Sequence, residues 1–214
     1  MNFCFKVPAE AWRQLRDARW EKLQKADFFR CFDNRSEGAE GADILLAALA
    51  RCSQLQELDM QLCYKVPAEA WRQLRDARWE KLQKADFSWC FNEDSQGAEG
   101  ADILLAALAR CSQLQELGMN FCFKVPAEAW RQLRDARWEK LQKADFFRCF
   151  GPGSQGVDGA DILLAALARC SALQELNMKY CDRIPAEAWE QLSDGVWPAL
   201  LKQEGVPERL FRRA

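Results

Sequence analysis

Histidine is absent from the whole 214-residue sequence. Its absence excludes Ser-His and Cys-His nucleophile pairs, an imidazole general base and any histidine-ligated metal. The ten cysteines contain no C-x-x-C pair, so a zinc site would also lack its usual ligand spacing. The sequence therefore predicts no metal and no cofactor, and it excludes most familiar hydrolase and metalloenzyme mechanisms.

An excess of either charge and a long apolar run are also missing. The sequence has 30 Lys+Arg against 32 Asp+Glu, without the basic excess that nucleic-acid binding needs. The longest apolar stretches, Ile44 to Ala50 and its copies, are seven residues long, about a third of the roughly 20 residues of a membrane helix. The first residues show no secretory signal pattern. We therefore expect an intracellular, most simply cytoplasmic, protein that binds neither nucleic acid nor membrane.

What the sequence does contain is one unit that has been copied. Residues 2–60, 61–119 and 120–178 align without a gap, which sets the period at 59 residues, and 179–214 begins a fourth copy. Self-similarity at a fixed period is typical of a solenoid or array. The fourth copy loses the pattern after Leu200, where Gly205 and Pro207 replace core residues. We expect a single repeat domain over residues 1–214, with a C-terminal cap within 179–214.

Each unit holds two strand-like segments, each followed by a helix-like one. Apolar residues recur as L-x-x-L-x-M-x-x-C from Leu55 to Cys63 and as L-x-x-A-x-F-x-x-C from Leu23 to Cys31. Alternation with period two predicts a short strand with one buried face. Helix formers follow in Pro8–Leu15 and Gly41–Cys52. This order predicts an α/β fold with a parallel sheet on one side and helices on the other.

An all-helical solenoid is the structural alternative. No helix breaker lies between Pro8 and Phe32, and residues 20–26 have high helix propensity. One long helix could then run through the segment interpreted as a strand. The shared cysteine register of the two half-units would be a coincidence in that arrangement, and for this reason we favour strands.

These residues resemble a leucine-rich repeat protein, whose strand signature is L-x-x-L-x-L-x-x-N/C-x-L. Cysteine fills the N/C position at Cys31, Cys63, Cys90, Cys122, Cys149 and Cys181. A second signature cysteine recurs at Cys52, Cys111 and Cys170. The combination is similar to the cysteine-containing and ribonuclease-inhibitor-like subclasses, which implies a curved leucine-rich-repeat solenoid with the sheet on its concave side. The sequence departs from the pattern at Ala26, Ala85 and Ala144, and at Trp20, Trp79 and Trp138.

All ten cysteines fall on repeat positions, with Cys4 as the strand-end member of a truncated first copy. We interpret them as small buried thiols that cap the turn after each strand. A disulfide framework and a redox role are the alternatives. Reduced thiols agree with an intracellular compartment.

The copies differ where residues are expected to face outward from the strands or to lie in one set of loops, whereas helices such as Pro8–Trp20 and Pro67–Trp79 are letter-identical. This organisation is typical of a binding surface, and exposed aromatic residues with arginine are typical interface anchors. We therefore predict a non-catalytic scaffold that binds a protein partner through its concave face and rim loops. The candidate partner-binding residues are Phe29, Arg30, Asp59, Gln61, Leu62, Ser88, Trp89, Asn120, Phe121, Phe147, Arg148, Asn177, Lys179 and Tyr180.

Other interpretations of the variation stay open. Neutral drift in exposed positions would also produce it. A structural or designed tandem array, selected for stacking or self-assembly without a dedicated partner, would keep near-identical repeats. Met1 aligns with the core residue Met60, so the sequence begins inside a strand motif. The uncapped edge predicts self-association, unless the chain is shortened or engineered.

Fixed charges are expected between the variable positions. Lys25, Lys84 and Lys143 alternate in strand order with Glu57, Glu116 and Glu175. Because neighbouring strands lie roughly 4.8 Å apart, we expect Lys–Glu ion pairs across the sheet, next to an acidic centre formed by Asp27, Asp86 and Asp145. Carboxylates repeated along an open surface, without a pocket, do not indicate acid–base catalysis.

Overall fold

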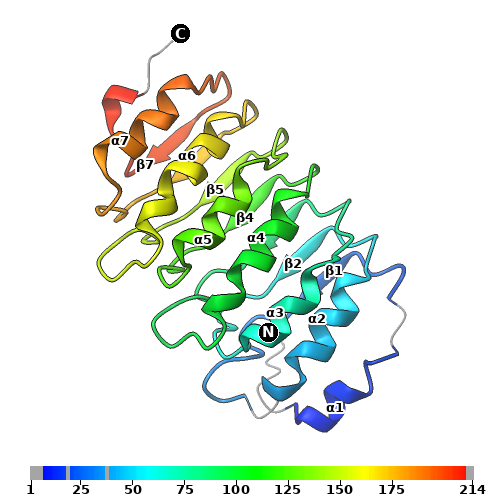
Figure 1. Cartoon of the computed structure of the whole chain (residues 1–214). Coiled ribbons are helices and arrows are strands. Elements are labelled where there is room, and N and C mark those ends of the chain that lie inside the picture. Colours follow the sequence, from blue (N-terminus) through cyan, green and yellow to red (C-terminus); the bar gives the residue numbers. More distant parts are fainter. Residues whose placement is uncertain (1–6, 18–19, 37–38, 211–214) are drawn as a thin grey trace.

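The strands of the computed structural model lie side by side in one parallel sheet, in the order in which they occur along the chain (Figure 1). The structure describes residues 7–17, 20–36 and 39–210. Within them the strands are β1 (Lys25–Asp27), β2 (Glu57–Asp59), β3 (Lys84–Asp86), β4 (Glu116–Gly118), β5 (Lys143–Asp145), β6 (Glu175–Asn177) and β7 (Lys202–Glu204). Each pairs with the next at equivalent positions, as Leu58 does with Ala85.

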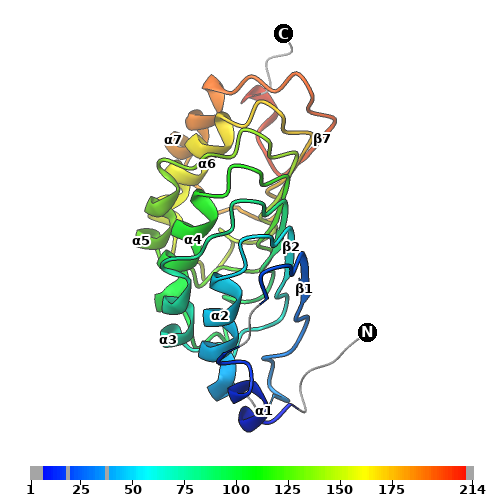
Figure 2. The same cartoon turned by 90° about the vertical axis from the view of Figure 1, so that its right-hand side faces the viewer.

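The helices alternate with these strands and cover one face of the sheet (Figures 1 and 2). They are α1 (Ala9–Arg13), α2 (Ala42–Ala50), α3 (Ala68–Trp71), α4 (Ala101–Ala109), α5 (Ala127–Trp130), α6 (Ala160–Ala168) and α7 (Ala186–Trp189). The short helices begin after a proline, such as Pro67, whose extended backbone occupies the N-cap. The predicted α/β leucine-rich-repeat solenoid is confirmed, and the all-helical alternative is wrong because residues 25–27 pair with β2 as a strand.

The core repeats with the sequence. Trp71 of α3 packs against Phe87 and Phe91, with ring centroids 6.0 and 5.3 Å apart. The same contacts recur around Trp130 one unit later. A Cβ atom added at Gly100 would lie 2.7 Å from the Cβ of Trp71, so only glycine permits this approach. The copied unit therefore carries its own core layer.

A second tryptophan of each unit connects neighbouring half-units. Trp79 Nε1 donates a hydrogen bond to the backbone oxygen of Leu49 at 3.0 Å, and Trp138 Nε1 donates to that of Leu108 at 2.9 Å. Both indole rings are buried. These tryptophans replace the second signature cysteine and satisfy carbonyl groups at the C-terminal ends of α2 and α4.

All nine cysteines within the described residues are buried thiols, and Cys4 lies outside those residues. Cys90 Sγ donates to the backbone oxygen of Met60 at 2.9 Å, and Cys122 Sγ donates to that of Phe87 at 3.2 Å. Burial raises the pKa of Cys122 to about 12. The thiols thus join one strand end to its neighbour, as the buried-thiol interpretation predicts.

The sheet continues to the strand motif that begins at Leu200. β7 pairs with β6 in the common register, with Gln203 opposite Leu176. Val206 and Leu210 are buried beyond it, and Leu210 ends a short 3-10 helix (Glu208–Leu210). At the other end, the strand motif of residues 1–4, where we expected an uncapped edge, lies outside the described residues.

Candidate functional site

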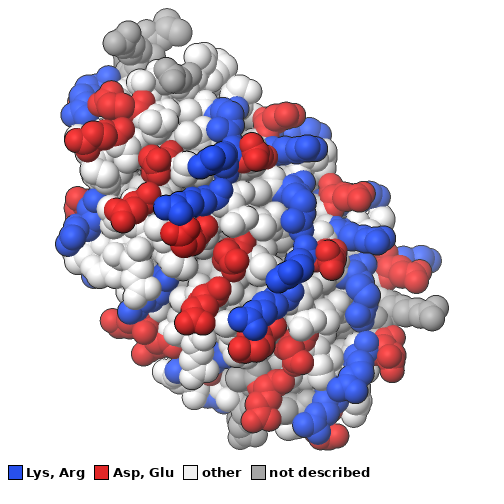
Figure 3. Space-filling view, in the orientation of Figure 1, with Lys and Arg blue, Asp and Glu red and all other residues white. Residues whose placement is uncertain are grey.

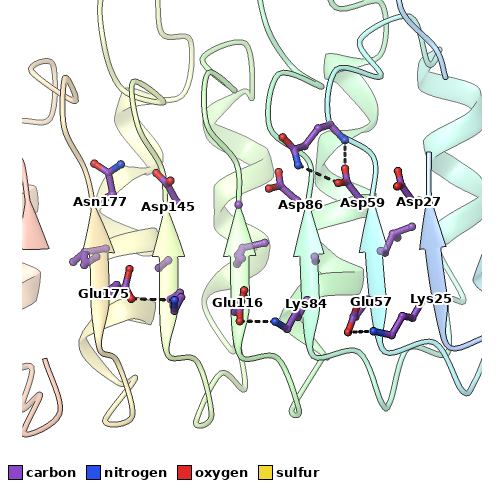
Figure 4. Close-up of a pocket in the computed structure, with 18 of the residues that line it drawn as sticks. Lys25, Asp27, Glu57, Asp59, Lys84, Asp86, Glu116, Asp145, Glu175 and Asn177 are labelled. Carbon is purple, nitrogen blue, oxygen red and sulfur yellow. Dashed lines mark hydrogen bonds and ion pairs between the residues drawn. The ribbon is translucent and has the colours of Figure 1, made fainter. Parts of the chain in front are cut away.

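The strands line an open groove with a volume of about 630 Å³ on the sheet face that the helices do not cover (Figure 4). The middle residue of each strand from β1 to β6 is buried, whereas the first and third face the groove. Two rows of side chains therefore cross the sheet. The charge row contains Lys25, Glu57, Lys84, Glu116, Lys143, Glu175 and Lys202. The acid row contains Asp27, Asp59, Asp86, Gly118, Asp145, Asn177 and Glu204.

The charge row is internally neutralised. Lys25 Nζ lies 2.8 Å from Glu57 Oε1, and the pairs of Lys84 with Glu116 and of Lys143 with Glu175 measure 2.8 and 3.0 Å (Figure 4). The Lys–Glu pairing expected from the sequence is thus confirmed. Each pair is exposed to solvent and contributes little to stability. The pairs leave this part of the groove with little net charge.

The acid row is different, because Asp59, Asp86 and Asp145 lack ion-pair partners, whereas Glu204 at its end pairs with Lys202 at 3.0 Å and Lys179 at 3.9 Å. Burial raises the pKa of Asp59, Asp86 and Asp145, and the neighbouring Asp59 raises that of Asp86 further. Ser88 N donates to Asp86 Oδ1 at 2.9 Å, which partly opposes this effect. Among the residues that the structure describes, no Lys or Arg forms an ion pair with any of these three carboxylates. These three aspartates form an unneutralised negative strip.

Glycine interrupts the acid row at β4. A Cβ atom added at Gly118 would lie 2.7 Å from the Cγ atom of Asp86, so the Asp86 carboxylate occupies the space that a side chain would fill. On the other side, Asn120 Nδ2 donates to Asp145 Oδ2 at 3.2 Å, and Asn120 Oδ1 accepts from Phe147 N at 3.2 Å. Asn120 therefore connects the acid row to residues beyond the strand ends.

A turn follows each of the first six strands and places one residue in the left-handed backbone region. We call these six residues the rim positions. They are Arg30, Leu62, Trp89, Phe121, Arg148 and Tyr180, with φ between 58° and 67°. Trp89 N donates to Asn120 O at 2.7 Å, and Phe121 N donates to Phe147 O at 2.9 Å, so the sheet ladder holds this conformation. Such a residue costs roughly 1–2 kcal/mol when it is not glycine.

Aromatic side chains from successive turns form a continuous stack. We call Trp89, Phe121, Phe147 and Tyr180 the aromatic ladder. The rings of Trp89 and Phe121 stack with centroids 3.8 Å apart and planes 17° apart. The next two centroid distances along the ladder are both 5.1 Å. The guanidinium of Arg148 lies 5.6 Å from the Phe121 ring centroid, over its face. The ladder is partly exposed, and Tyr180 reaches 52% exposure.

The structure separates the fourteen candidate residues into four groups. Asp59, Gln61 and Asn177 line the groove. The rim positions and Phe147 lie beyond the strand ends and do not line it. Ser88 is 2% exposed and cannot contact a partner; its hydroxyl accepts a hydrogen bond from Asn120 N at 3.1 Å and supports Asp86.

The remaining candidates border these features. Phe29 N donates to Asp27 Oδ1 at 3.0 Å, Asn120 Nδ2 donates to Asp145 Oδ2 at 3.2 Å, and the Lys179 ammonium lies 5.6 Å from the Tyr180 ring centroid. Comparing copies did not select Asp86 and Asp145 as contacts, because they do not vary between copies. Their position as third strand residue next to variable neighbours is the signal that could have found them.

The helical face carries positive and negative side chains in interleaved rows (Figure 3). Arg110 Nη2 donates to the backbone oxygen of Arg75 at 3.0 Å, and Arg169 Nη2 donates to that of Arg134 at 2.8 Å. In the described part of the chain, no cluster of three or more His, Cys, Asp or Glu side chains could hold a metal ion. No helix among the same residues is long and apolar enough to cross a membrane.

Comparisons with known proteins agree with this architecture. No protein-family model matches the sequence. The chain is similar to F-box/LRR-repeat protein 4 of Bos taurus, with 26% identity over 165 residues, which cover 76% of this chain and 23% of that relative. The chain thus spans about a quarter of the length of the relative it matches. Its repeated strand signature, its single parallel sheet with alternating helices and this similarity are together consistent with a leucine-rich-repeat solenoid.

Proposed function

We propose that this protein is a non-catalytic scaffold that binds a protein partner through the groove and the rim positions. The aromatic ladder carries the proposal. Large apolar rings are partly exposed at successive turns, on a backbone that the sheet ladder holds rigid. Aromatic residues and arginine supply most binding hot spots, and a preformed surface loses little entropy on binding.

The distribution of sequence differences supports the same function. The rim positions hold Phe, Trp, Tyr, Leu and Arg in different copies, while the helices behind them are nearly unchanged. A fixed scaffold with variable surface anchors is how repeat proteins produce extended binding faces. The similarity to a protein named for its leucine-rich repeats points to protein interaction in general. We further propose an intracellular, cytoplasmic location, which the buried thiols support.

Affinity capture from a cell extract, followed by a binding titration of the captured protein, tests the proposal. Trp89→Ala is the test variant. Leu201→Ala is the matched control, because Leu201 is 84% exposed and lies in the last repeat, away from the ladder. We expect the same partner with wild type and control, and about 30-fold weaker binding by Trp89→Ala, as for a hot spot of about 2 kcal/mol. Equal affinities for the two variants would contradict the proposal.

A self-assembling array is the second candidate function, because large apolar side chains are exposed near the C-terminal end of the sheet. Val196 is 67% exposed and Leu201 is 84% exposed. Light scattering over a concentration series tests it. Concentration-dependent growth that Leu201→Asp abolishes would support an array, and a strict monomer would contradict it.

A further inference from the structure

The negative strip of the groove lies directly beside the aromatic ladder. Asp86 and Trp89 belong to the same strand and turn, three residues or roughly 10 Å apart along an extended chain. Asn120 contacts both Asp145 and the backbone of Phe147, so acid row and ladder also meet one unit later. A bound segment that touches one of these features therefore reaches the other.

The charges of the groove indicate that a bound partner would be positively charged there. The lysines of the charge row are paired with glutamates, whereas Asp59, Asp86 and Asp145 have no cation among the described residues. Burial and mutual repulsion make their charge unfavourable in the folded protein. A cationic side chain from a partner would relieve both effects.

The aromatic ladder favours arginine over lysine as the cationic side chain of the partner. Arg148 already places its guanidinium over the Phe121 ring at 5.6 Å, which shows that this ring face accepts a guanidinium. A planar guanidinium can stack on an aromatic ring and donate two hydrogen bonds to a carboxylate. An ammonium group cannot combine the two contacts in one plane.

The spacing suits an extended segment. Asp59 and Asp86 lie on adjacent strands, roughly 4.8 Å apart, and Asp145 lies two strands further on. At Gly118 the Asp86 carboxylate occupies the space that a side chain would fill, so the negative charge continues across β4 toward Asp145. Side chains on one face of an extended peptide repeat about every 6.8 Å, so two repeats span the roughly 14 Å from Asp59 to Asp145. We propose that the partner contributes an extended, arginine-bearing segment that crosses the strands along the acid row with its guanidinium groups against the aromatic ladder. This inference rests on the proposed function.

Peptide titration of the full chain tests the inference directly. The probes are three labelled octapeptides in which glycine alternates with arginine, lysine or glutamate, and fluorescence anisotropy reports their binding. We expect the arginine peptide to bind at least about tenfold more tightly than the lysine peptide, and the glutamate peptide not to bind. Equal affinity for the arginine and lysine peptides would overturn the role of the ladder.

Single substitutions test whether the arginine peptide binds at the acid row and the aromatic ladder. Asp86→Asn, Asp145→Asn and Trp89→Ala are each expected to weaken the arginine peptide by about tenfold, or 1.4 kcal/mol. Asp76→Asn removes the same charge from an exposed residue beside Arg51 and Arg78, away from the strands, and is expected to change nothing. A similar loss in Asp76→Asn would show unspecific attraction and overturn the inference, as would unchanged binding by Asp86→Asn and Asp145→Asn.

Arg148→Ala and a competition experiment complete the test. Because Arg148 covers the Phe121 ring, removing it is expected to strengthen arginine-peptide binding by about threefold or more. The arginine peptide is also expected to displace the captured partner. A partner whose binding depends on Trp89 but resists this competition would overturn the inference and leave the proposed function intact. A partner whose binding does not depend on Trp89 would overturn the proposed function.

Discussion

Replacing Asp86 with asparagine should stabilise the folded protein at neutral pH, although it removes a charge that the inferred partner needs. Asp86 is half-buried, its charge is close enough to Asp59 to raise its pKa, and it forms no ion pair in the described part of the chain. Burial and its acidic neighbours raise its pKa above that of an unfolded aspartate. The charged form is therefore less stable in the folded state than in the unfolded chain.

The size of the gain follows from the register. Asp59 and Asp86 are direct partners on β2 and β3. The Asp86 carboxylate lies over Gly118, on the side of β4, so its charge is further from Asp59 than the strand spacing alone suggests. Two unit charges about 5–8 Å apart repel by roughly 0.5–1 kcal/mol in water and about 2–3 kcal/mol at an effective dielectric constant near 20. Asparagine still accepts the hydrogen bond from Ser88 N but loses its charge-assisted part, which offsets about 1 kcal/mol. We expect a net gain of about 1 kcal/mol in the free energy of unfolding.

Urea denaturation followed by circular dichroism measures this gain. At neutral pH the midpoint of Asp86→Asn should exceed that of wild type by roughly 0.3 M, for an m value of about 3 kcal/mol/M. Because the pKa of Asp86 is raised in the folded state, the wild-type protein becomes less stable as the pH rises through that pKa. At about pH 3, where Asp86 is protonated in both the folded and the unfolded state, the midpoints of wild type and Asp86→Asn should be equal. A lower midpoint at neutral pH, or an equal gain at about pH 3, would refute the reasoning.

Three further predictions concern the scaffold. Leu62→Val is expected to lower the free energy of unfolding by about 1–2 kcal/mol because a β-branched residue resists a φ of 61°, whereas Leu62→Gly should keep or raise it, as urea denaturation will show. Trp79→Phe leaves the backbone oxygen of Leu49 without its indole donor and should cost about 1–3 kcal/mol, measured in the same way. Cys111 and Cys122, whose pKa burial raises to about 12, should stay unreactive toward a thiol reagent at mildly alkaline pH until denaturant is added; rapid reaction of the native protein would contradict their burial.

The scaffold could be predicted from the sequence because copying repeats every local signal. The cysteine at each strand end fixed the strand register, and that register in turn predicted that Lys84 and Glu116 would meet across the sheet. The same reasoning marked the outward positions of each strand. Asp59 and Gln61 do line the groove.

The rim geometry could not be predicted in the same way. Positions with a left-handed backbone usually hold glycine or asparagine, which makes them recognisable in a sequence. This chain has Leu62, Trp89 and Tyr180 at such positions, so the sequence does not indicate their backbone conformation. The stacking of Trp89 on Phe121 depends on the lateral distance between two turns, which sequence alone does not give. Ser88 looked exposed because phenylalanine replaces it in the other copies, yet the contact with Asp86 buries it.

The uniform register also determines how such a surface can change in size. The junction between β2 and β3 repeats the junction between β4 and β5, with Glu57 opposite Lys84 and Glu116 opposite Lys143. Deleting residues 61–119 would therefore join two ends that already fit each other. The loss would shorten the sheet by two strands, or roughly 10 Å, and would remove Trp89 and the glycine gap together. Gain or loss of a whole unit thus gives evolution a way to alter the reach of the surface in fixed steps, while each remaining interface between repeats is preserved.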